Sequence, residues 1–311
     1  MKLLVKSGGR EAMAEWQRHF GAVDPTIEVV YWEDAGDPAS VDYVMAWEPP
    51  AGWLATLPNL KVVFSSGAGV DHITKDPAWP SQLPLVRMGG PDMAQRMGEF
   101  VVWSALSLLR DTRDFALGQP LKEWRYKEVP HSAADRRVGV MGLGNLGLRS
   151  AQMLSAVGFP VQGWSRSAKS LPGMKTFAGA AEFDAFIEST DILVCLLPVT
   201  PDTADLIDAK LLANLPAGAQ IINVGRGQHV VDADLIAALD SGHIAGAVLD
   251  VFRGEPLAAE SPLWTHERVT VTPHIASTPT RAEKAEFVAR CIGLNEKGEA
   301  MPNIFDPARG Y

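Results

Sequence analysis

Three ionisable residues each follow a predicted strand in the second half of the chain. Arg226 lies in a glycine-flanked turn, Glu255 precedes a proline, and His274 follows the strand predicted at Val269–Thr272. In an open α/β sheet, ligands bind outside the carboxyl ends of the strands. We therefore expect these three side chains to converge on one site.

Together, these residue types can reduce a carbonyl group. The guanidinium of Arg226 can hold an acidic substrate and polarise its carbonyl oxygen through a fork of donors. His274 can give a proton to that oxygen near neutral pH, and Glu255 beside it would favour the imidazolium and fix its orientation. Such a reaction requires no metal ion. Each residue alone is more typical of a turn or surface position, whereas all three at strand ends favour catalysis.

A glycine-rich turn that suits a dinucleotide precedes these residues. The apolar run Val138–Met141 stops at a glycine, two more glycines follow at the spacing G-x-G-x-x-G, and a helical pattern begins. The backbone N–H groups of such a turn and the helix N-terminus can bind a pyrophosphate. Glycine-rich turns also join strands to helices without any ligand, but this one opens an alternating βαβ series. The predicted cofactor-binding residues here are Gly142, Leu143, Gly144, Asn145, Leu146 and Gly147.

The loop after the next strand indicates which dinucleotide binds. NAD-binding domains carry an acid there, which holds the ribose 2′-hydroxyl. This loop instead has Ser165, Arg166, Ser167 and Lys169, and no acid. Arg166 can bond a 2′-phosphate through two N–H groups, whereas a carboxylate would repel it. The alternative is an exposed loop that is basic by chance. We predict NADP(H) as the cofactor, with NADPH preferred to NADH.

Alternating strands and helices predict an α/β protein with parallel sheets. We expect a substrate-binding domain of residues 1–97 and 278–311 and an NADP-binding domain of residues 98–277. The predicted folds are a doubly wound Rossmann nucleotide-binding domain and a smaller, flavodoxin-like α/β substrate domain. Residues 111–137 are either an excursion from the domain or a subunit contact. The strands predicted for the nucleotide-binding domain are Val138–Met141, Val161–Trp164, Asp191–Leu197, Gln220–Val224, Ala247–Val251 and Val269–Thr272.

Two loops of the first domain are candidates for substrate binding. Trp47 ends a predicted strand before two prolines, where it either walls a small pocket or packs in the core. The second loop follows the strand at Lys61–Ser65 and is rich in glycine. Such a loop can aim successive backbone N–H groups at an anion, or it can be an ordinary strand-to-helix turn. Its candidate residues are Gly67, Ala68, Gly69 and Val70.

Composition restricts the class of protein. The chain has 311 residues, 47% of them hydrophobic, and a net charge of −9, which argues against a nucleic-acid or anionic-membrane partner. Its two cysteines, Cys195 and Cys291, have no metal-ligand spacing and form no disulfide framework. We see no signal peptide and no apolar stretch long enough to span a bilayer. These features predict a cytoplasmic protein.

Several motifs occur together in the order and spacing of one enzyme family. They are the glycine-rich turn, Asn223-Val224-Gly225-Arg226-Gly227, Leu249-Asp250-Val251-Phe252 through Glu255-Pro256, and Thr272-Pro273-His274. They resemble the D-isomer-specific 2-hydroxyacid dehydrogenases over nearly the whole chain. Within that family, the bacterial glyoxylate/hydroxypyruvate reductase A type is the most similar. The features that support this subgroup are Trp164-Ser165-Arg166-Ser167, Phe177-Ala178-Gly179, Trp47-Glu48-Pro49-Pro50 and the ending Ala308-Arg309-Gly310-Tyr311.

The resemblance implies roles for further residues. It makes Arg226 the anchor of the substrate carboxylate and carbonyl, His274 the general acid and Glu255 its partner. It implies that the Gly67–Val70 loop binds the substrate carboxylate and that two subunits pair through their nucleotide domains. Ile275-Ala276-Ser277-Thr278 departs from the pattern of the subgroup. The residues implied at the cofactor are Leu197, Pro198, Val224, Gly225 and Asp250.

The function predicted from the sequence is NADPH-dependent reduction of small 2-oxo acids, such as glyoxylate and hydroxypyruvate, to 2-hydroxy acids. One alternative is another branch of the family. A phosphoglycerate-type, NAD-dependent enzyme fits less well with the basic loop, and the formate branch lacks a carboxylate at the position of Glu255. The other alternative is a non-catalytic, dinucleotide-sensing scaffold that resembles a corepressor.

Overall fold

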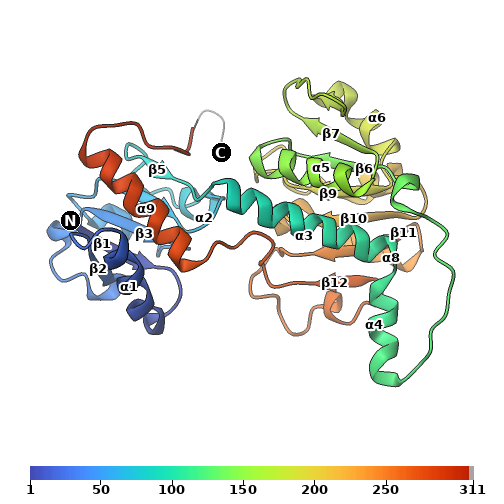
Figure 1. Ribbon diagram of the computed structural model, residues 1–311, viewed down its shortest axis with the longest axis horizontal. Helices are drawn as coiled ribbons and strands as arrows, with labels where there is room; N and C mark the ends of the chain where they lie inside the picture. The colour runs from blue at the N-terminus through green and yellow to red at the C-terminus, as the bar shows by residue number, and fades with distance from the viewer. Residues whose placement is uncertain (308–311) are drawn as a thin grey trace. The chain divides into compact units, whose positions relative to one another are not determined.

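The computed structural model describes residues 1–307, and it divides into two compact units (Figure 1). The first unit comprises Met1–Gly90 and the chain from Pro279 onward, and the second comprises Pro91–Thr278. The sequence prediction drew these boundaries at 97/98 and 277/278. The difference arises because helix α3 (Pro91–Leu109) packs against α5 (Asn145–Val157), β10 (Ala219–Asn223) and β11 (Ile244–Leu249) of the second unit. The ending Ala308-Arg309-Gly310-Tyr311 lies outside the described residues.

The first unit is built on a parallel sheet with the strand order β2-β1-β3-β4-β5. This order is that of the flavodoxin-like fold, which the sequence predicted for this domain. Helices α1 and α9 lie side by side in this unit (Figure 1). The elements are β1 (Lys2–Lys6), α1 (Met13–Val23), β2 (Glu28–Tyr31), β3 (Tyr43–Ala46), β4 (Val62–Ser65), α2 (Asp71–Thr74), β5 (Leu85–Val86) and α9 (Arg281–Glu296).

The second unit is built on a seven-stranded parallel sheet with the order β12-β11-β10-β9-β6-β7-β8. The chain runs outward from β6 in one direction and from β9 in the other, which is the doubly wound Rossmann arrangement. The predicted fold class is confirmed, with one strand, β8, that the sequence did not predict. The strands are β6 (Val138–Met141), β7 (Val161–Ser165), β8 (Lys175–Ala178), β9 (Ile192–Cys195), β10 (Ala219–Asn223), β11 (Ile244–Leu249) and β12 (Val269–Val271).

Both faces of this sheet are covered by helices. Successive side chains of a strand point to opposite faces. Val138 and Val140 of β6 therefore share a core with Val101 of α3 and Leu154 of α5, while Met141 joins the core on the other face. This explains why the strands appear in the sequence as nearly continuous apolar runs. The helices of the second face are α6 (Phe183–Glu188), α7 (Ala209–Asn214) and α8 (Asp232–Asp240).

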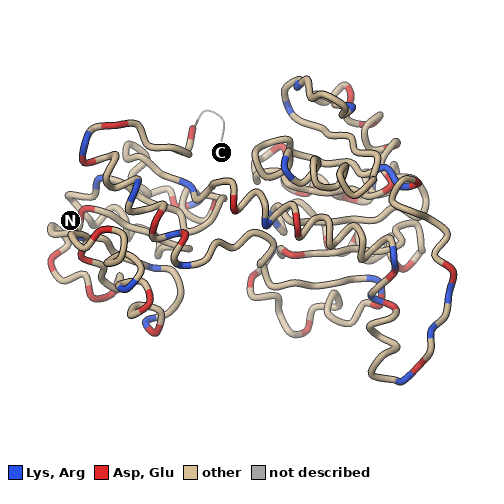
Figure 2. Tube along the Cα trace, viewed as in Figure 1, with Lys and Arg blue, Asp and Glu red and all other residues tan. Residues whose placement is uncertain are grey.

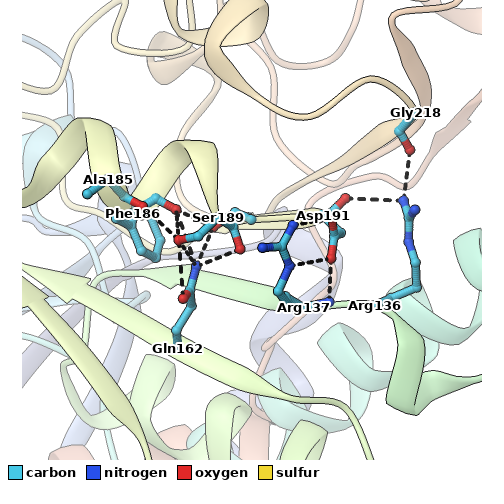
Figure 3. A network of polar contacts seen from close by, with 9 residues as sticks. Arg136, Arg137, Gln162, Ala185, Phe186, Ser189, Asp191 and Gly218 are labelled. Atoms are coloured by element: carbon cyan, nitrogen blue, oxygen red, sulfur yellow. Dashed lines mark hydrogen bonds and ion pairs between the residues drawn. The ribbon is translucent and has the colours of Figure 1, made fainter.

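The amino ends of the central strands are tied together by polar side chains (Figure 3). Asp191, just before β9, accepts hydrogen bonds from the backbone N–H of Arg137 at 2.7 Å and from its Nε at 2.9 Å. Arg136 donates to the carbonyl oxygen of Gly218, just before β10, at 2.8 Å. Gln162 of β7 donates to the segment that leads into β9. This edge of the sheet is therefore fixed independently of the opposite, carboxyl edge.

We expect Asp191→Asn to lower the free energy of unfolding by about 2 kcal/mol at pH 7, because the change weakens several hydrogen bonds to a charged group. Burial acts to raise the pKa of Asp191, but the hydrogen bonds from Arg137 outweigh it, so the pKa lies below its usual value. Such a carboxylate stabilises the fold above its unfolded-state pKa of about 4, and this stabilisation is lost as the pH falls through the lower, folded-state pKa.

Urea unfolding at pH 7 and at pH 3 measures this effect. The difference between the variant and the wild type should shrink at the lower pH. Asp202→Asn is the matched control, since Asp202 is an exposed acid of the same unit. Equal stability of Asp191→Asn and the wild type at pH 7 would contradict the expected role of this edge.

Residues 111–137 contain helix α4 (Thr112–Leu121), which extends away from the sheet of its unit, and a segment that returns from it (Figure 1). This segment carries both acidic and basic residues (Figure 2). Arg125 pairs with Asp114 at 2.9 Å, which ties the segment to the helix. Trp124 and Tyr126 are 94% and 81% exposed. Within residues 1–307, no helix is both long and apolar enough to cross a membrane.

Candidate active site

Arg226 lies in the turn after β10, and its backbone is held on both sides. Its N–H donates to Nδ1 of His229 at 3.1 Å, and its carbonyl oxygen accepts from Nδ2 of Asn223 at 2.9 Å. The carboxamide oxygen of Asn223 also accepts from the N–H of Gly225 at 3.2 Å. Both Asn223 and His229 are fully buried. The turn that presents the guanidinium is therefore set by two buried polar side chains.

The glycine after the arginine is required by the neighbouring loop. A Cβ atom on Gly227 would lie 1.8 Å from the carbonyl carbon of Phe252, which follows β11. No side chain fits there, so the turn after β10 and the loop after β11 meet backbone to backbone. This close approach brings Arg226 near the loop that carries Glu255.

Glu255 and His274 form a hydrogen-bonded pair. Nδ1 of His274 and Oε2 of Glu255 are 2.7 Å apart, and the two side chains are 33% and 32% exposed. Oε1 of Glu255 accepts from the N–H of Phe252 at 2.9 Å. Burial acts to raise the pKa of Glu255, but the bonds from His274 and Phe252 and the charge of Arg226 outweigh it, so the pKa is lowered. The structure thus brings all three predicted catalytic residues together.

Asp250 organises the turn that carries the histidine. One carboxylate oxygen accepts from the hydroxyl of Thr272 at 2.6 Å and the N–H of Ile275 at 2.9 Å, and the other accepts from the N–H of Ala276 at 2.9 Å. His274 itself has a φ of 54°, a left-handed conformation that costs energy for a residue other than glycine. Burial raises the pKa of Asp250 despite these bonds. In this structure, Asp250 holds the histidine turn in place.

The glycine-rich turn joins β6 to α5 as predicted. Gly142 has a φ of 100°, and a Cβ on it would lie 2.7 Å from the carbonyl oxygen of Leu196. A Cβ on Gly147 would collide with the carbonyl oxygen of Gly142. The space around Gly144 is open, and no side chain of the described residues caps the helix that begins there. The N-terminus of α5 therefore has the free approach that a phosphate group needs.

The basic loop after β7 lies against this turn. Nζ of Lys169 donates to the carbonyl oxygen of Leu143, and the carbonyl oxygen of Trp164 accepts from the N–H of Gly142. Ser165 is almost fully buried, and its hydroxyl bonds the carbonyl oxygen of Ser167, so it shapes the loop. Arg166 and Ser167 are exposed. The remaining cofactor candidates, Leu197, Pro198, Val224 and Gly225, lie in the segments after β9 and β10.

In the first unit, a buried hydrogen-bond network joins the two loops predicted to bind substrate. Nδ1 of His72 accepts from the N–H of Glu48 at 3.1 Å, and its Nε2 lies 3.0 Å from Oγ of Ser65. That hydroxyl donates to the carbonyl oxygen of Gly69 at 2.7 Å. The ring of Trp47 packs on His72, with 4.2 Å between the ring centroids. The ring of Trp47 is thus packed next to the glycine loop, and its role as the wall of a pocket stays a prediction.

The glycine loop has the donors of an anion site. Across residues 1–307, the backbone N–H groups of Ala68, Gly69 and Val70 have no acceptor within the chain. Three successive donors of this kind can bind a carboxylate.

Gly67 is the position at which this loop tolerates no side chain. A Cβ there would lie 2.9 Å from the ring of Trp47, which is held against His72. We expect Gly67→Ala to lower the free energy of unfolding by about 1–3 kcal/mol, the usual cost of overpacking. Gly21→Ala is the control, because Gly21 is in α1 with open space around it, and this change should stabilise the protein by about 0.5–1 kcal/mol. Urea unfolding measures both variants, and a Gly67→Ala variant as stable as the wild type would refute the steric argument.

Sequence reasoning assigned no role to Asn223, His229 or His72. Each hydrogen-bonds to the backbone of a loop. For two of them the sequence held one indication of such a role, since Asn223 and His229 each lie three residues from Arg226.

Comparison with protein families gives one match. The family model described as D-isomer specific 2-hydroxyacid dehydrogenase, NAD binding domain, matches residues 102–276. This range contains all three predicted catalytic residues, Arg226, Glu255 and His274.

Solved structures match over the whole chain. A D-isomer-specific 2-hydroxyacid dehydrogenase from Xanthobacter autotrophicus Py2, in complex with NADPH and MES, is 42% identical, with a TM-score of 0.90 and 99% of each chain covered. An NADPH-dependent glyoxylate/hydroxypyruvate reductase from Sinorhizobium meliloti, with NADP and sulfate, is 38% identical, with a TM-score of 0.90 and 100% and 99% coverage. A probable 2-hydroxyacid dehydrogenase from Rhizobium etli CFN 42, with NADP, HEPES and L(+)-tartaric acid, is 36% identical, with a TM-score of 0.88 and 100% and 99% coverage.

Proposed function

Since this chain belongs to the D-isomer-specific 2-hydroxyacid dehydrogenase family, we propose that it reduces small 2-oxo acids, glyoxylate and hydroxypyruvate among them, with NADPH. The observation that carries this proposal is the pairing of His274 with Glu255 beside the charge of Arg226. Reduction of a 2-oxo acid needs a cation, here Arg226, to hold the carboxylate. It also needs an acid, here His274, to protonate the carbonyl oxygen. The glyoxylate/hydroxypyruvate activity of the Sinorhizobium meliloti relative supports the choice of substrates.

The chain's own residues divide the reaction between them. Arg226 binds the substrate carboxylate and draws electron density towards the carbonyl oxygen. His274, through the ring nitrogen that does not face Glu255, gives its proton to that oxygen as the alkoxide develops. Glu255 remains ionised, because its pKa is lowered, and it stabilises the imidazolium before the transfer.

The residues around the glycine-rich turn fit NADP(H). The open space at Gly144 and the uncapped N-terminus of α5 suit the pyrophosphate. The exposed guanidinium of Arg166, in a loop without acids, suits the 2′-phosphate. When bound, the cofactor supplies the hydride that reaches the carbonyl carbon. The crystallised relatives with NADPH or NADP support this assignment.

A substrate panel tests the proposed function. Absorbance at 340 nm follows NADPH oxidation after glyoxylate, hydroxypyruvate, pyruvate or a larger 2-oxo acid is added. We expect the highest kcat/KM with glyoxylate or hydroxypyruvate. Faster NAD-dependent oxidation of phosphoglycerate would favour the other branch of the family. Cofactor binding without turnover of any compound would favour the sensing scaffold.

We expect Arg166→Ala to raise the KM for NADPH about 10- to 100-fold, because hydrogen bonds to a charged phosphate contribute about 1.5–3 kcal/mol. The KM for NADH, which has no 2′-phosphate, should stay within about twofold. Steady-state kinetics with both cofactors measures the effect, and Lys210→Ala, an exposed cation of α7, is the control. An equal rise in the KM for NADPH and for NADH would show that Arg166 does not bind the 2′-phosphate.

We propose that the first unit also binds the substrate carboxylate, because one of its loops has suitable donors. The free N–H groups of residues 68–70 are the proposed donors, and Trp47 is the proposed wall. Cofactor binding belongs to the second unit in this proposal. We place the enzyme in the cytoplasm, where the buried thiols of Cys195 and Cys291 would stay reduced.

We also propose a homodimer that forms through the second unit. Five exposed apolar side chains of the described residues lie on α3, α4 and the segment that returns from α4, and a second copy of the chain would cover them. Light scattering should give twice the mass of the 33.5 kDa chain. Trp124→Ser combined with Tyr126→Ser should give the monomer, whereas Val23→Ser of α1 should not. These exposed side chains are Trp103, Phe115, Leu121, Trp124 and Tyr126.

A further inference from the structure

His229 is a buried histidine with both ring nitrogens bonded. Its side chain is fully buried at the end of the short turn Gly227–His229. Nδ1 lies 3.1 Å from the backbone nitrogen of Arg226, and Nε2 lies 3.2 Å from the carbonyl oxygen of Pro198. No role in the proposed chemistry uses this side chain directly.

Its partners determine which nitrogen carries the proton. A backbone N–H can only donate, so Nδ1 must be the acceptor towards Arg226. A carbonyl oxygen can only accept, so Nε2 must carry the proton that bonds Pro198. The neutral ring in this tautomer satisfies both bonds, and no other tautomer does.

The ring connects two strand ends of the second unit. Pro198 follows β9, and Arg226 follows β10. A Cβ on Gly225 would lie 3.1 Å from the His229 ring and 3.0 Å from the carbonyl oxygen of Leu197, so the three segments are closely packed. With Asn223 bonded to the carbonyl oxygen of Arg226 and His229 bonded to its N–H, the backbone of the arginine has little freedom to rotate.

We infer that His229 is a positioning residue that fixes the direction of Arg226 by accepting its backbone N–H. This inference rests on the proposed function in one respect, namely that Arg226 binds the substrate. A loose arginine turn would bind the substrate carboxylate in several orientations, of which few are productive.

Two substitutions separate positioning from packing. His229→Asn places Oδ1 where Nδ1 stood and keeps an acceptor for the Arg226 N–H, but it leaves a cavity. His229→Phe keeps the volume of the ring and removes the acceptor. We expect His229→Phe to lower kcat/KM for glyoxylate about 30-fold, which corresponds to about 2 kcal/mol, and His229→Asn to stay within about fivefold of the wild type.

The dissociation constant for NADPH should change less than about threefold in both variants, and the control His243→Phe should leave kcat/KM unchanged. His243 also bonds a carbonyl oxygen, but it stands before β11 at the amino edge of the sheet. A packing role gives the opposite order, with His229→Phe more active than His229→Asn, and that order would overturn the inference.

If the wild type reduces no 2-oxo acid, the proposed function is refuted, but the role of His229 can still be tested. Crystal structures of the two variants provide that test. The Arg226 turn should be displaced in His229→Phe and kept in His229→Asn. An undisplaced turn in His229→Phe would show that the hydrogen bond does not set its position.

Discussion

His274→Gln is expected to lower kcat for glyoxylate reduction by about two to four orders of magnitude, the usual contribution of a positioned general acid. Glutamine has a similar length and can still hydrogen-bond to Glu255, but it cannot give up a proton. The dissociation constant for NADPH should stay within about twofold, because the histidine turn is held by Asp250 and not by the imidazole. Single-turnover kinetics at 340 nm and a separate NADPH titration measure the two quantities.

Two further variants define what His274 contributes. Glu255→Gln should cost less than His274→Gln, because the carboxylate acts through the imidazole. His19→Gln, a histidine of α1 in the first unit, should have the wild-type rate. If His274→Gln kept more than a tenth of the wild-type kcat, the proton would have to come from another group.

Arg226→Gln is expected to lower kcat/KM for glyoxylate about 1,000-fold, which corresponds to about 4 kcal/mol of transition-state stabilisation. The guanidinium holds the substrate carboxylate before reaction and the carbonyl oxygen as its charge grows, so KM should rise and kcat should fall together. Arg226→Lys should recover only part of the loss, because an ammonium group keeps the charge but lacks the fork of donors.

The steady-state constants of both arginine variants, measured over a range of glyoxylate concentrations, test this role. Arg149→Gln removes an exposed charge from α5 and should leave the kinetics unchanged. A variant Arg226→Gln whose KM rises while kcat is unchanged would limit the arginine to substrate binding.

The sequence predicted the parts of the fold that depend on apolar periodicity. Strand β6 (Val138–Met141) begins and ends as predicted, because helices cover it on both faces. The other buried strands were predicted with shifted ends, and β11 begins at Ile244 instead of the predicted Ala247. Strand β8 (Lys175–Ala178) was missed, since it lies at the edge of the sheet and only Phe177 in it is buried. Helix α4 was missed because it contains Gly118 and Pro120, which usually interrupt a helix.

The proximity of the three proposed catalytic residues was predictable because parallel strands place their carboxyl ends at one edge. The residues that hold these side chains in position were not predictable. Whether Asn223 and His229 point at the backbone of Arg226 depends on turn conformation, which residue types do not specify. The use of both Asp250 oxygens by the histidine turn likewise depends on how β11 and β12 end.

The polar ties between Arg136, Arg137, Asp191 and Gly218 have a practical consequence for directed evolution. They stabilise the sheet at the edge opposite to the reactive side chains. Libraries that randomise only the exposed positions of the loops after the strands would leave this anchorage intact, so altered substrate preference can be explored with little loss of folded variants. Libraries that reach these four positions would discard many clones before any change in selectivity is seen.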